Sequence, residues 1–266
     1  MEIRGRQFDL AGATYVMGIL NVTPDSFSDG GLHNSTDAAV KHALKMINDG
    51  ASIIDIGGES TRPGFKSVPA EEEIKRVIPV IKALREVSDI AISVDTTKAE
   101  VAREAVLAGA DIVNTVEGVK ASDEMLSVVR ESGAVFVMTY ENSYVNQFGE
   151  ELIKMAQRAE DAGIDASKII IDPGIGFGKT QDENLRIINE LPILTKTGYP
   201  MLLGCSRKSV IGNVLNVEPG DRLAGTITTT VLAALAGVAI VRVHDVLENM
   251  QAVKMCRAVL ISGGKV

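Results

Sequence analysis

The sequence has no tryptophan, only two cysteines among its 266 residues, and no long hydrophobic run. Cys205 and Cys256 show no metal-ligand spacing and no disulfide framework, as is typical of proteins in a reducing compartment. No apolar run approaches the ~18 residues that a membrane helix needs, and the N-terminal segment lacks the positive-then-apolar order of a secretory signal. These absences predict a soluble, cytoplasmic protein that does not enter a membrane.

Positive charge is also scarce, because 27 Lys and Arg residues stand against 35 Asp and Glu residues, giving a formal net charge of −8. This balance argues against a broad surface for nucleic acid or for an acidic membrane, although a few basic residues can still converge on a small anion. We therefore expect small-molecule substrates and no nucleic-acid partner. With 45% hydrophobic residues and no low-complexity tract, the chain can bury one substantial core.

Eight short apolar runs, rich in β-branched residues, recur along the chain. They are nearly continuous rather than alternating, as expected for parallel strands that are buried on both faces. The runs span residues 14–21, 52–58, 90–97, 111–116, 134–140, 168–174, 200–206 and 239–245.

Helical patterns separate these runs, and one helix is expected after each strand. The first helix has Ser35 or Thr36 as a candidate N-cap and Gly50 as its stop, and the second contains Pro79, which should bend it. The remaining patterns span residues 98–108, 121–132, 149–162, 182–191, 222–236 and 246–261. Eight alternations in about 250 residues match an α/β fold of the (β/α)8 TIM-barrel type, with a single domain over residues 1–266. A doubly wound sheet usually has fewer strands and a glycine-rich first turn.

Polar residues close most of the apolar runs. Any single Asn or Asp at such a place can simply cap a turn, but one barrel would point the whole set into one mouth. Hydrogen-bond acceptors on one side of the mouth could bind the edge of a flat nitrogen heterocycle. Basic residues on the other side could hold phosphate or another anion. The acceptor set is Asp95, Asn114 and Asp172; the basic set is Arg62, Lys208, Arg242 and His244; Asn21, Asp55, Ser206, Arg207 and Asp245 complete the strand ends.

The stretch "DPGIGFGKT", residues 172–180, ends like a nucleotide-binding loop. Only three residues separate Gly174 from Gly178, where the phosphate-loop motif needs four. The glycines more simply allow a sharp turn that passes close to a ligand. Lys179 is then a loop lysine, with a ligand role as the alternative.

Six motifs in chain order resemble the dihydropteroate synthase family. They are "MGILNVTPDSFSDGG" (17–31), "DIGGESTRPG" (55–64), "SVDTTKAEVA" (93–102), "DPGIGFGKT", "LLGCSRKSVIG" (202–212) and "RVHD" (242–245). The resemblance implies a transferase that condenses 6-hydroxymethyl-7,8-dihydropterin diphosphate with p-aminobenzoate. The products would be 7,8-dihydropteroate and pyrophosphate, in the step of folate biosynthesis that sulfonamides block.

Carried over to this chain, the resemblance divides the site into three parts and assigns the chemistry to Asp95, Asp172, Lys208, Arg242 and His244. The pterin side would be Asp95, Asn114, Met138, Asp172, Gly204 and Lys208. The aminobenzoate side would be Thr61, Arg62, Pro63, Phe177, Lys208 and Ser209, with segment 23–31 closing over it through Phe27. The diphosphate side would be Asn21, Arg242 and His244, with Mg²⁺ bound next to Asn21. Cys205 would be a wall residue, and residues 248–261 would contribute to a homodimer.

The implied chemistry is chiefly the loss of pyrophosphate from the pterin methylene, followed by attack of the aniline nitrogen. Two positions depart from the family pattern: Thr115 replaces an Asp, and Thr139 replaces a His. Two alternatives therefore stand beside the synthase. One is a pterin-binding methyltransferase, against which "ESTRPG" and "SRKS" argue; the other is a catalytically quiet homologue that binds pterin.

Overall fold

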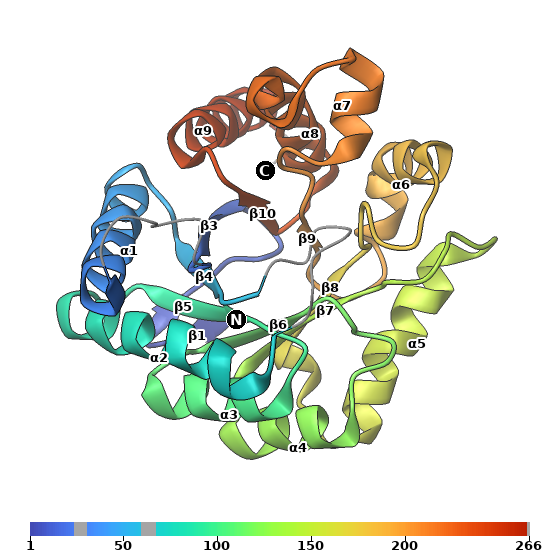
Figure 1. Cartoon of the computed structure of the whole chain (residues 1–266). Helices are drawn as coiled ribbons and strands as arrows, with labels where there is room; N and C mark the ends of the chain where they lie inside the picture. The colour runs from blue at the N-terminus through green and yellow to red at the C-terminus, as the bar shows by residue number, and fades with distance from the viewer. Residues whose placement is uncertain (24–30, 60–67, 265–266) are drawn as a thin grey trace.

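Strands and helices alternate around a closed ring in the computed structural model, which describes residues 1–23, 31–59 and 68–264 (Figure 1). The barrel strands are β3 (Tyr15–Asn21), β4 (Ile53–Gly57), β5 (Ala91–Asp95), β6 (Ile112–Thr115), β7 (Val135–Thr139), β8 (Ile169–Asp172), β9 (Leu202–Leu203) and β10 (Ile240–Val243). The helices are α1 (Gly31–Asn48), α2 (Ala70–Val87), α3 (Ala99–Ala108), α4 (Asp123–Ser132), α5 (Phe148–Asp161), α6 (Gln181–Leu194), α7 (Ser209–Leu215), α8 (Leu223–Ala236) and α9 (Val246–Ser262).

The eight strands form one parallel sheet in the order β8-β7-β6-β5-β4-β3-β10-β9. The two edge strands meet through a parallel bridge between Ile171 and Met201, and the Ile171 N–H donates to the Pro200 carbonyl at 3.0 Å. The predicted (β/α)8 barrel is therefore confirmed. Each of the eight predicted strands is present with narrower bounds, and β9 has only two of the seven residues predicted for it.

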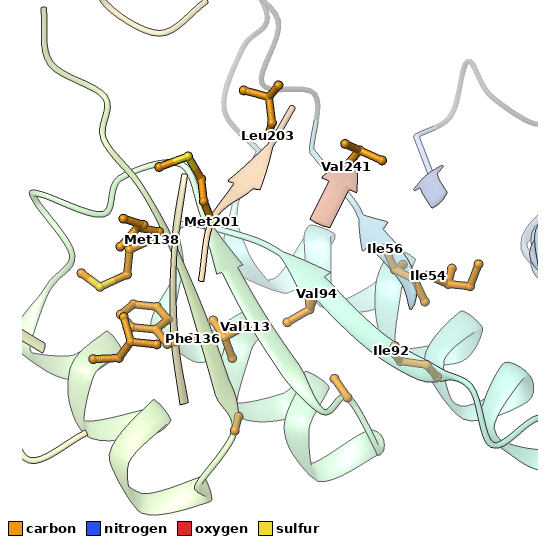
Figure 2. Close-up of a cluster of buried hydrophobic side chains, with 14 of the residues drawn as sticks. Ile54, Ile56, Ile92, Val94, Val113, Phe136, Met138, Met201, Leu203 and Val241 are labelled. Atoms are coloured by element: carbon orange, nitrogen blue, oxygen red, sulfur yellow. The ribbon is translucent and has the colours of Figure 1, made fainter. Parts of the chain in front are cut away.

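Each strand is buried on both faces, which is why its sequence reads as a continuous apolar run. Side chains that point inward, such as Met17, Ile53 and Ile112, fill the barrel interior. Alternate side chains point outward and form a second cluster against the helices, where Phe136 and Val113 lie (Figure 2). The interior is packed toward the N-terminal ends of the strands, so only their C-terminal ends can open into a site.

Four local features differ from the sequence prediction. The seventh strand is followed by two helices rather than one, because the seven-residue α7 is too short to show a periodic pattern. Helix α1 begins at Gly31, before the expected caps at Ser35 and Thr36, and α6 runs through Pro192 to Leu194. A short antiparallel hairpin, β1 (Glu2–Ile3) with β2 (Arg6–Gln7), precedes the barrel. Within the described ranges, no helix is long and apolar enough to cross a membrane.

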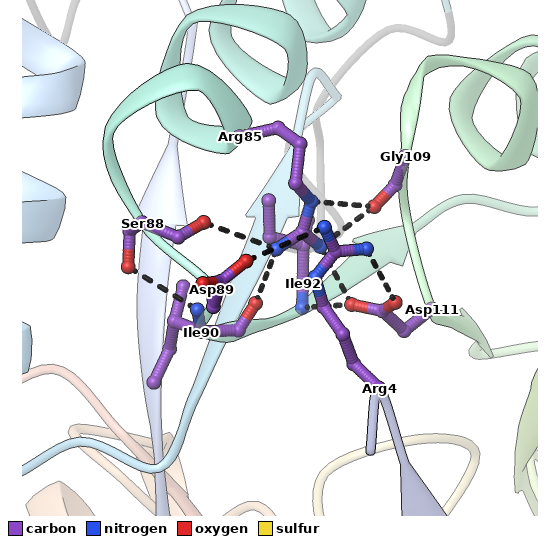
Figure 3. Close-up of polar contacts among 8 residues, drawn as sticks. All are labelled: Arg4, Arg85, Ser88, Asp89, Ile90, Ile92, Gly109 and Asp111. Atoms are coloured by element: carbon purple, nitrogen blue, oxygen red, sulfur yellow. Dashed lines mark hydrogen bonds and ion pairs between the residues drawn. The ribbon is translucent and has the colours of Figure 1, made fainter. Parts of the chain in front are cut away.

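An ionic cluster at the N-terminal ends of β5 and β6 joins several segments of the chain (Figure 3). The Arg85 guanidinium, at the end of α2, donates to the carbonyls of Ser88, Ile90 and Gly109. It also lies 2.6 Å from the Oδ2 atom of Asp111, which precedes β6. Helix α2, the loop that leads into β5 and the loop that leads into β6 are thereby joined by one side chain.

Replacing Asp111 by alanine is expected to lower the free energy of unfolding by about 2 kcal/mol, because it leaves part of the Arg85 guanidinium unpaired and removes the acceptor of the Ile92 N–H. Asp89→Ala is the matched control, because the Asp89 side chain is 93% exposed and its ion pair with Arg4 spans 3.5 Å. Urea unfolding measures both variants, and equal losses in the two would contradict a structural role for the cluster.

Candidate functional site

The strand ends that carry polar residues meet at one end of the barrel. Asn21 is paired with Gly57, Gly57 with Asp95, and Asp95 with Asn114, so these residues lie at one level across β3, β4, β5 and β6. Asp172 is the last residue of β8, on the other side of the ring. The sequence prediction that these side chains share one barrel mouth therefore agrees with the strand register.

Arg242, on β10, reaches two carboxylates in the barrel mouth. Its Nε atom lies 2.6 Å from Asp55 Oδ2, and its Nη2 atom lies 2.6 Å from Asp95 Oδ2. The Asn114 amide also donates to Asp55 Oδ2, at 3.2 Å. Burial disfavours the charged guanidinium, but the two carboxylates outweigh burial and raise the pKa of Arg242. The four side chains form one hydrogen-bonded network.

Asp55 is the residue of this network whose importance the sequence did not reveal. It was noted as a polar strand residue and received no role in the site, yet it is completely buried and contacts both Arg242 and Asn114. The signal was a carboxylate within the apolar run "SIIDIGG", because a charge buried in a strand requires a partner of opposite charge. Asp55 orients the two side chains that contact it.

The Asp95 carboxylate has a strongly shifted pKa and one oxygen atom without a hydrogen-bond partner. Burial raises its pKa to about 7; Arg242 opposes this shift, whereas the nearby charge of Asp55 adds to it. Among the described residues, the Oδ1 atoms of Asp55 and Asp95 are both buried without a hydrogen-bond partner. Unpaired buried oxygens are costly, so an N–H group of a ligand would bind favourably here.

Asp172 and Lys208 form the second charged part of the mouth. Burial raises the pKa of Asp172, against the opposing effects of Lys208 and of the Gly174 N–H, which donates to Asp172 Oδ1 at 2.7 Å. Burial lowers the pKa of Lys208, and the charge of Asp172 opposes this. A Cβ atom on Gly204 would lie 3.7 Å from Asp172 Oδ2 and 3.8 Å from Lys208 Nζ, so the glycine leaves space between the two charges.

The loop after β8 completes this side of the mouth. Lys208 Nζ donates to the Ile175 carbonyl and lies 4.4 Å from the centroid of the Phe177 ring. Lys179 Nζ instead donates to the carbonyls of Tyr140, Gly174 and Phe177. Its ammonium group is therefore occupied by backbone, and the alternative of a direct ligand role has no support in its contacts.

His244 lies beside the seventh and eighth barrel strands. Its Nδ1 atom is 3.0 Å from Ser206 Oγ, which also accepts from the His244 backbone N–H at 3.2 Å. Next to this pair, Arg207 Nε lies 3.0 Å from Asp245 Oδ2 and ties the loop after β9 to the loop after β10. These contacts hold His244 in place at the same end of the barrel as Arg242.

Three other sequence predictions concern the walls of the mouth. Cys205 is buried, and burial raises its thiol pKa to about 12, which fits a wall residue and excludes an activated nucleophile. Met138 is fully buried in the helix-facing cluster of Figure 2, so its position indicates packing, and its contact with pterin stays a prediction. Thr115 and Thr139, the two departures from the family pattern, are both buried.

Part of the expected aminobenzoate side lies outside the described residues. This applies to Thr61, Arg62 and Pro63 and to residues 24–30 of the expected closing segment. Ser209 is exposed at the first position of α7, directly after Lys208. The described part of that side therefore consists of Phe177, Lys208 and Ser209.

Asn21 provides an oxygen suited to a hard cation. It is half-buried at the end of β3. Its Oδ1 atom lies near Gly57, which has no side chain; a Cβ atom added to Gly57 would lie 3.8 Å from this oxygen. The described residues contain no cluster of three His, Cys, Asp or Glu side chains that could hold a metal. A single amide oxygen fits Mg²⁺ where phosphate oxygens and water supply the other ligands.

The chain is similar to proteins of known function over nearly its whole length. A family model described as "Pterin binding enzyme" matches residues 17–244. A dihydropteroate synthase of Clostridium beijerinckii is 47% identical over 262 residues, covering 96% of this chain and 97% of the relative. A dihydropteroate synthase of Bacillus subtilis is 49% identical over 257 residues, covering 94% of this chain and 90% of the relative.

Solved structures of dihydropteroate synthases are also similar to this chain. A dihydropteroate synthase of Clostridium difficile, determined in the presence of pteroic acid, has a TM-score of 0.89 and 48% identity, covering 95% of this chain and 99% of that chain. A dihydropteroate synthase of Xanthomonas albilineans in complex with 7,8-dihydropteroate has a TM-score of 0.87 and 41% identity, covering 96% of each chain.

Proposed function

The chain belongs to the dihydropteroate synthase family of pterin-binding enzymes, and from this we propose that it condenses 6-hydroxymethyl-7,8-dihydropterin diphosphate with p-aminobenzoate. The products are 7,8-dihydropteroate and pyrophosphate. The observation that carries the proposal is the barrel mouth, where Asp95 is paired with Asn114, Asp172 ends β8 near Lys208, and the charges of Asp95 and Lys208 act on each other. Full-length identity of 47–49% to curated relatives supports the same reaction.

The pterin is held by the acceptors of the mouth. The Asp172 carboxylate, the Asn114 amide and the unpaired Oδ1 of Asp95 complement the N–H groups and carbonyl of the heterocycle. Lys208 and the Phe177 ring form one wall, and the Gly204 position leaves room for a flat ring. Fixed carboxylates around the ring favour positive charge that develops on the pterin in the transition state.

The reaction then proceeds by leaving-group loss. The bond between the pterin methylene carbon and the diphosphate oxygen breaks, the aniline nitrogen forms a new bond to that carbon, and the nitrogen gives up a proton to the departing pyrophosphate. The Cys205 thiol is buried with a pKa of about 12, so it does not suit a covalent intermediate on the enzyme. Asp95 and Asp172 stabilise the pterin cation between the two steps.

The diphosphate lies next to Arg242, His244 and Asn21. Arg242 is held by Asp55 and Asp95, so its charge is fixed in position before the substrate arrives. His244 is held by Ser206 in the same way. We propose that the Asn21 amide oxygen is the protein ligand of Mg²⁺, which when bound neutralises charge on the departing pyrophosphate.

The specificity constant kcat/KM for the pterin diphosphate is expected to rise with pH through about 7. Asp95 is protonated below its pKa of about 7, and the neutral acid neither pairs fully with Arg242 nor stabilises a positive pterin. Asp95→Asn should remove this step from the profile. The substrate's own ionisation is common to both proteins, so an identical inflection in wild type and variant would assign the step to the substrate.

One assay tests the proposed reaction against its two alternatives. The purified chain receives the dihydropterin diphosphate, Mg²⁺ and labelled p-aminobenzoate, and both dihydropteroate and pyrophosphate should form in equal amounts. Binding of the pterin diphosphate in calorimetry without product would favour the quiet homologue. Binding of methyl-folate but not of the diphosphate would favour the methyltransferase. Omission of Mg²⁺ in the same assay tests the metal proposal, because turnover should then fall.

We further propose that the chain forms a homodimer through its C-terminal helices. Large apolar side chains remain exposed there, on α8 (Leu232 and Leu235) and on α9 (Met255, Val259 and Ile261). Exposed apolar residues on neighbouring helices are typical of a subunit interface. Sedimentation measures the mass, with a dimer expected at twice the 28.3 kDa of one chain.

Both cysteines are free and buried, which fits a reducing compartment such as the cytoplasm.

A further inference from the structure

Lys179 is a largely buried ammonium group whose contacts the reaction itself does not explain. Its Nζ atom donates to the carbonyls of Tyr140 at 2.7 Å, Gly174 at 3.0 Å and Phe177 at 3.0 Å. An ammonium group has three donors, so three carbonyls use all of them. The same nitrogen lies 5.4 Å from the Tyr140 ring and 5.8 Å from the Phe148 ring, within the range of cation–π attraction.

The three carbonyls belong to two segments that must stay together for the mouth to keep its shape. Tyr140 follows β7, whereas Gly174 and Phe177 belong to the loop after β8. The approach is close, because Gly174 has a φ of +73° and a Cβ atom there would lie 2.1 Å from the Tyr140 carbonyl oxygen. Gly178, with a φ of +60°, meets the Glu141 carbonyl in the same way. The three carbonyl oxygens that accept from Lys179 Nζ carry partial negative charge, and the positive charge of the ammonium group between them offsets their mutual repulsion.

The same loop also contacts the Lys208 side chain. The Ile175 carbonyl accepts from Lys208 Nζ, and the Phe177 ring lies under the same nitrogen. Asp172, whose charge faces Lys208, is the residue from which the loop starts. A displacement of the loop would therefore move the acceptor and the ring that fix the Lys208 ammonium beside Asp172.

We infer that Lys179 is a positioning residue: by joining three backbone carbonyls it fixes the loop of residues 173–178, and through Ile175 and Phe177 it sets the place of the Lys208 ammonium in the mouth. Lys179 does not touch substrate. The inference deepens the proposed function and rests on it, because Lys208 has its assigned role only if the mouth carries out the synthase reaction.

The charge of Lys179 is sensitive to pH. Burial lowers its pKa to about 8, and the charged groups that face it are Asp172 on β8, Lys208 after β9, Glu141 after β7 and Glu183 on α6. Above that pH the neutral amine has only two N–H donors for three carbonyls and loses its attraction to the rings. Turnover should therefore fall as pH rises through about 8.

Three variants at Lys179 and one elsewhere separate positioning from general stability. Lys179→Met keeps the apolar stem and removes every donor, and turnover should fall by about tenfold. Lys179→Arg keeps the charge and several donors and should recover part of the rate. Because arginine stays protonated, it should also lose the decline near pH 8, whereas Lys179→Gln should resemble Lys179→Met. The matched control is Lys154→Met, because Lys154 forms an exposed ion pair with Glu151 within α5.

A second measurement does not depend on turnover. Hydrogen exchange of the peptide that contains residues 173–178 should be faster in Lys179→Met than in wild type and unchanged in Lys154→Met. A wild-type rate and unchanged exchange in Lys179→Met would overturn the inference. A decline near pH 8 that persists in Lys179→Arg would also overturn it, because the decline would then come from a group other than Lys179. If the wild-type chain makes no dihydropteroate, the proposed function fails, and the exchange result still decides whether Lys179 holds the loop.

Discussion

Asp172→Asn and Lys208→Ala are each expected to lower turnover at least about tenfold, because each removes a charged contact worth about 1.5 to 3 kcal/mol. Asparagine can still accept the Gly174 N–H, so the first variant keeps the local turn and loses mainly the negative charge. Lys208→Ala removes the ammonium between the Ile175 carbonyl and the Phe177 ring. Steady-state rates with both substrates measure the effect.

The pair also allows a test of coupling. Because the charges of Asp172 and Lys208 each shift the pKa of the other group, the double variant should lose less than the two single losses added together. Lys45→Met serves as the control, because Lys45 forms an exposed ion pair with Asp49 on α1. Wild-type rates in both single variants would exclude this part of the site assignment.

Arg242→Met is expected to abolish measurable turnover and to lower the free energy of unfolding by about 3 to 5 kcal/mol near pH 8. The variant leaves the carboxylates of Asp55 and Asp95 buried without their cation, and an uncompensated buried charge is strongly destabilising. The expected loss in the free energy of unfolding is larger than for a surface arginine, whose ion pair contributes about 1 kcal/mol or less.

The pH dependence of this loss has a definite sign. Without Arg242, the buried Asp95 loses the cation that opposes the rise in its pKa, so the folded chain binds more protons than the unfolded chain in the range from about pH 4 to about pH 8. The variant's stability therefore falls as pH rises, and part of the lost stability should return near pH 5. Urea unfolding at both pH values measures it, with Lys154→Met as the control. A loss independent of pH would mean that cavity formation, not charge, is responsible.

The fold was readily predictable because its signal is local. A strand buried on both faces must be apolar at nearly every position, so the runs around β3 to β10 could be counted without knowledge of their partners. Asp95 and Asp172 were found for the same reason, because each is the polar residue that ends such a run. Helix α7 was missed because seven residues are too few for a helical period to show.

The partners of the polar residues were not predictable in this way. Arg242 contacts Asp55 and Asp95, which lie 187 and 147 residues away along the chain. Nothing in the sequence near any of the three indicates that they form one network, and Asp55 accordingly received no role. Lys179 is a similar case, because its Tyr140 carbonyl partner lies 39 residues away.

The sequence by itself therefore determined the barrel and most of the polar residues that lie at the C-terminal ends of its strands. The patterns of hydrophobic burial and of alternating strands and helices involve consecutive residues, so a short stretch of sequence is enough to show them. Only the tertiary structure decided which charges meet, that Asp55 holds Arg242 and Asn114, and that Lys179 binds backbone rather than ligand. Those outcomes depend on distances of about 3 Å between groups that the closed barrel brings together from distant parts of the chain.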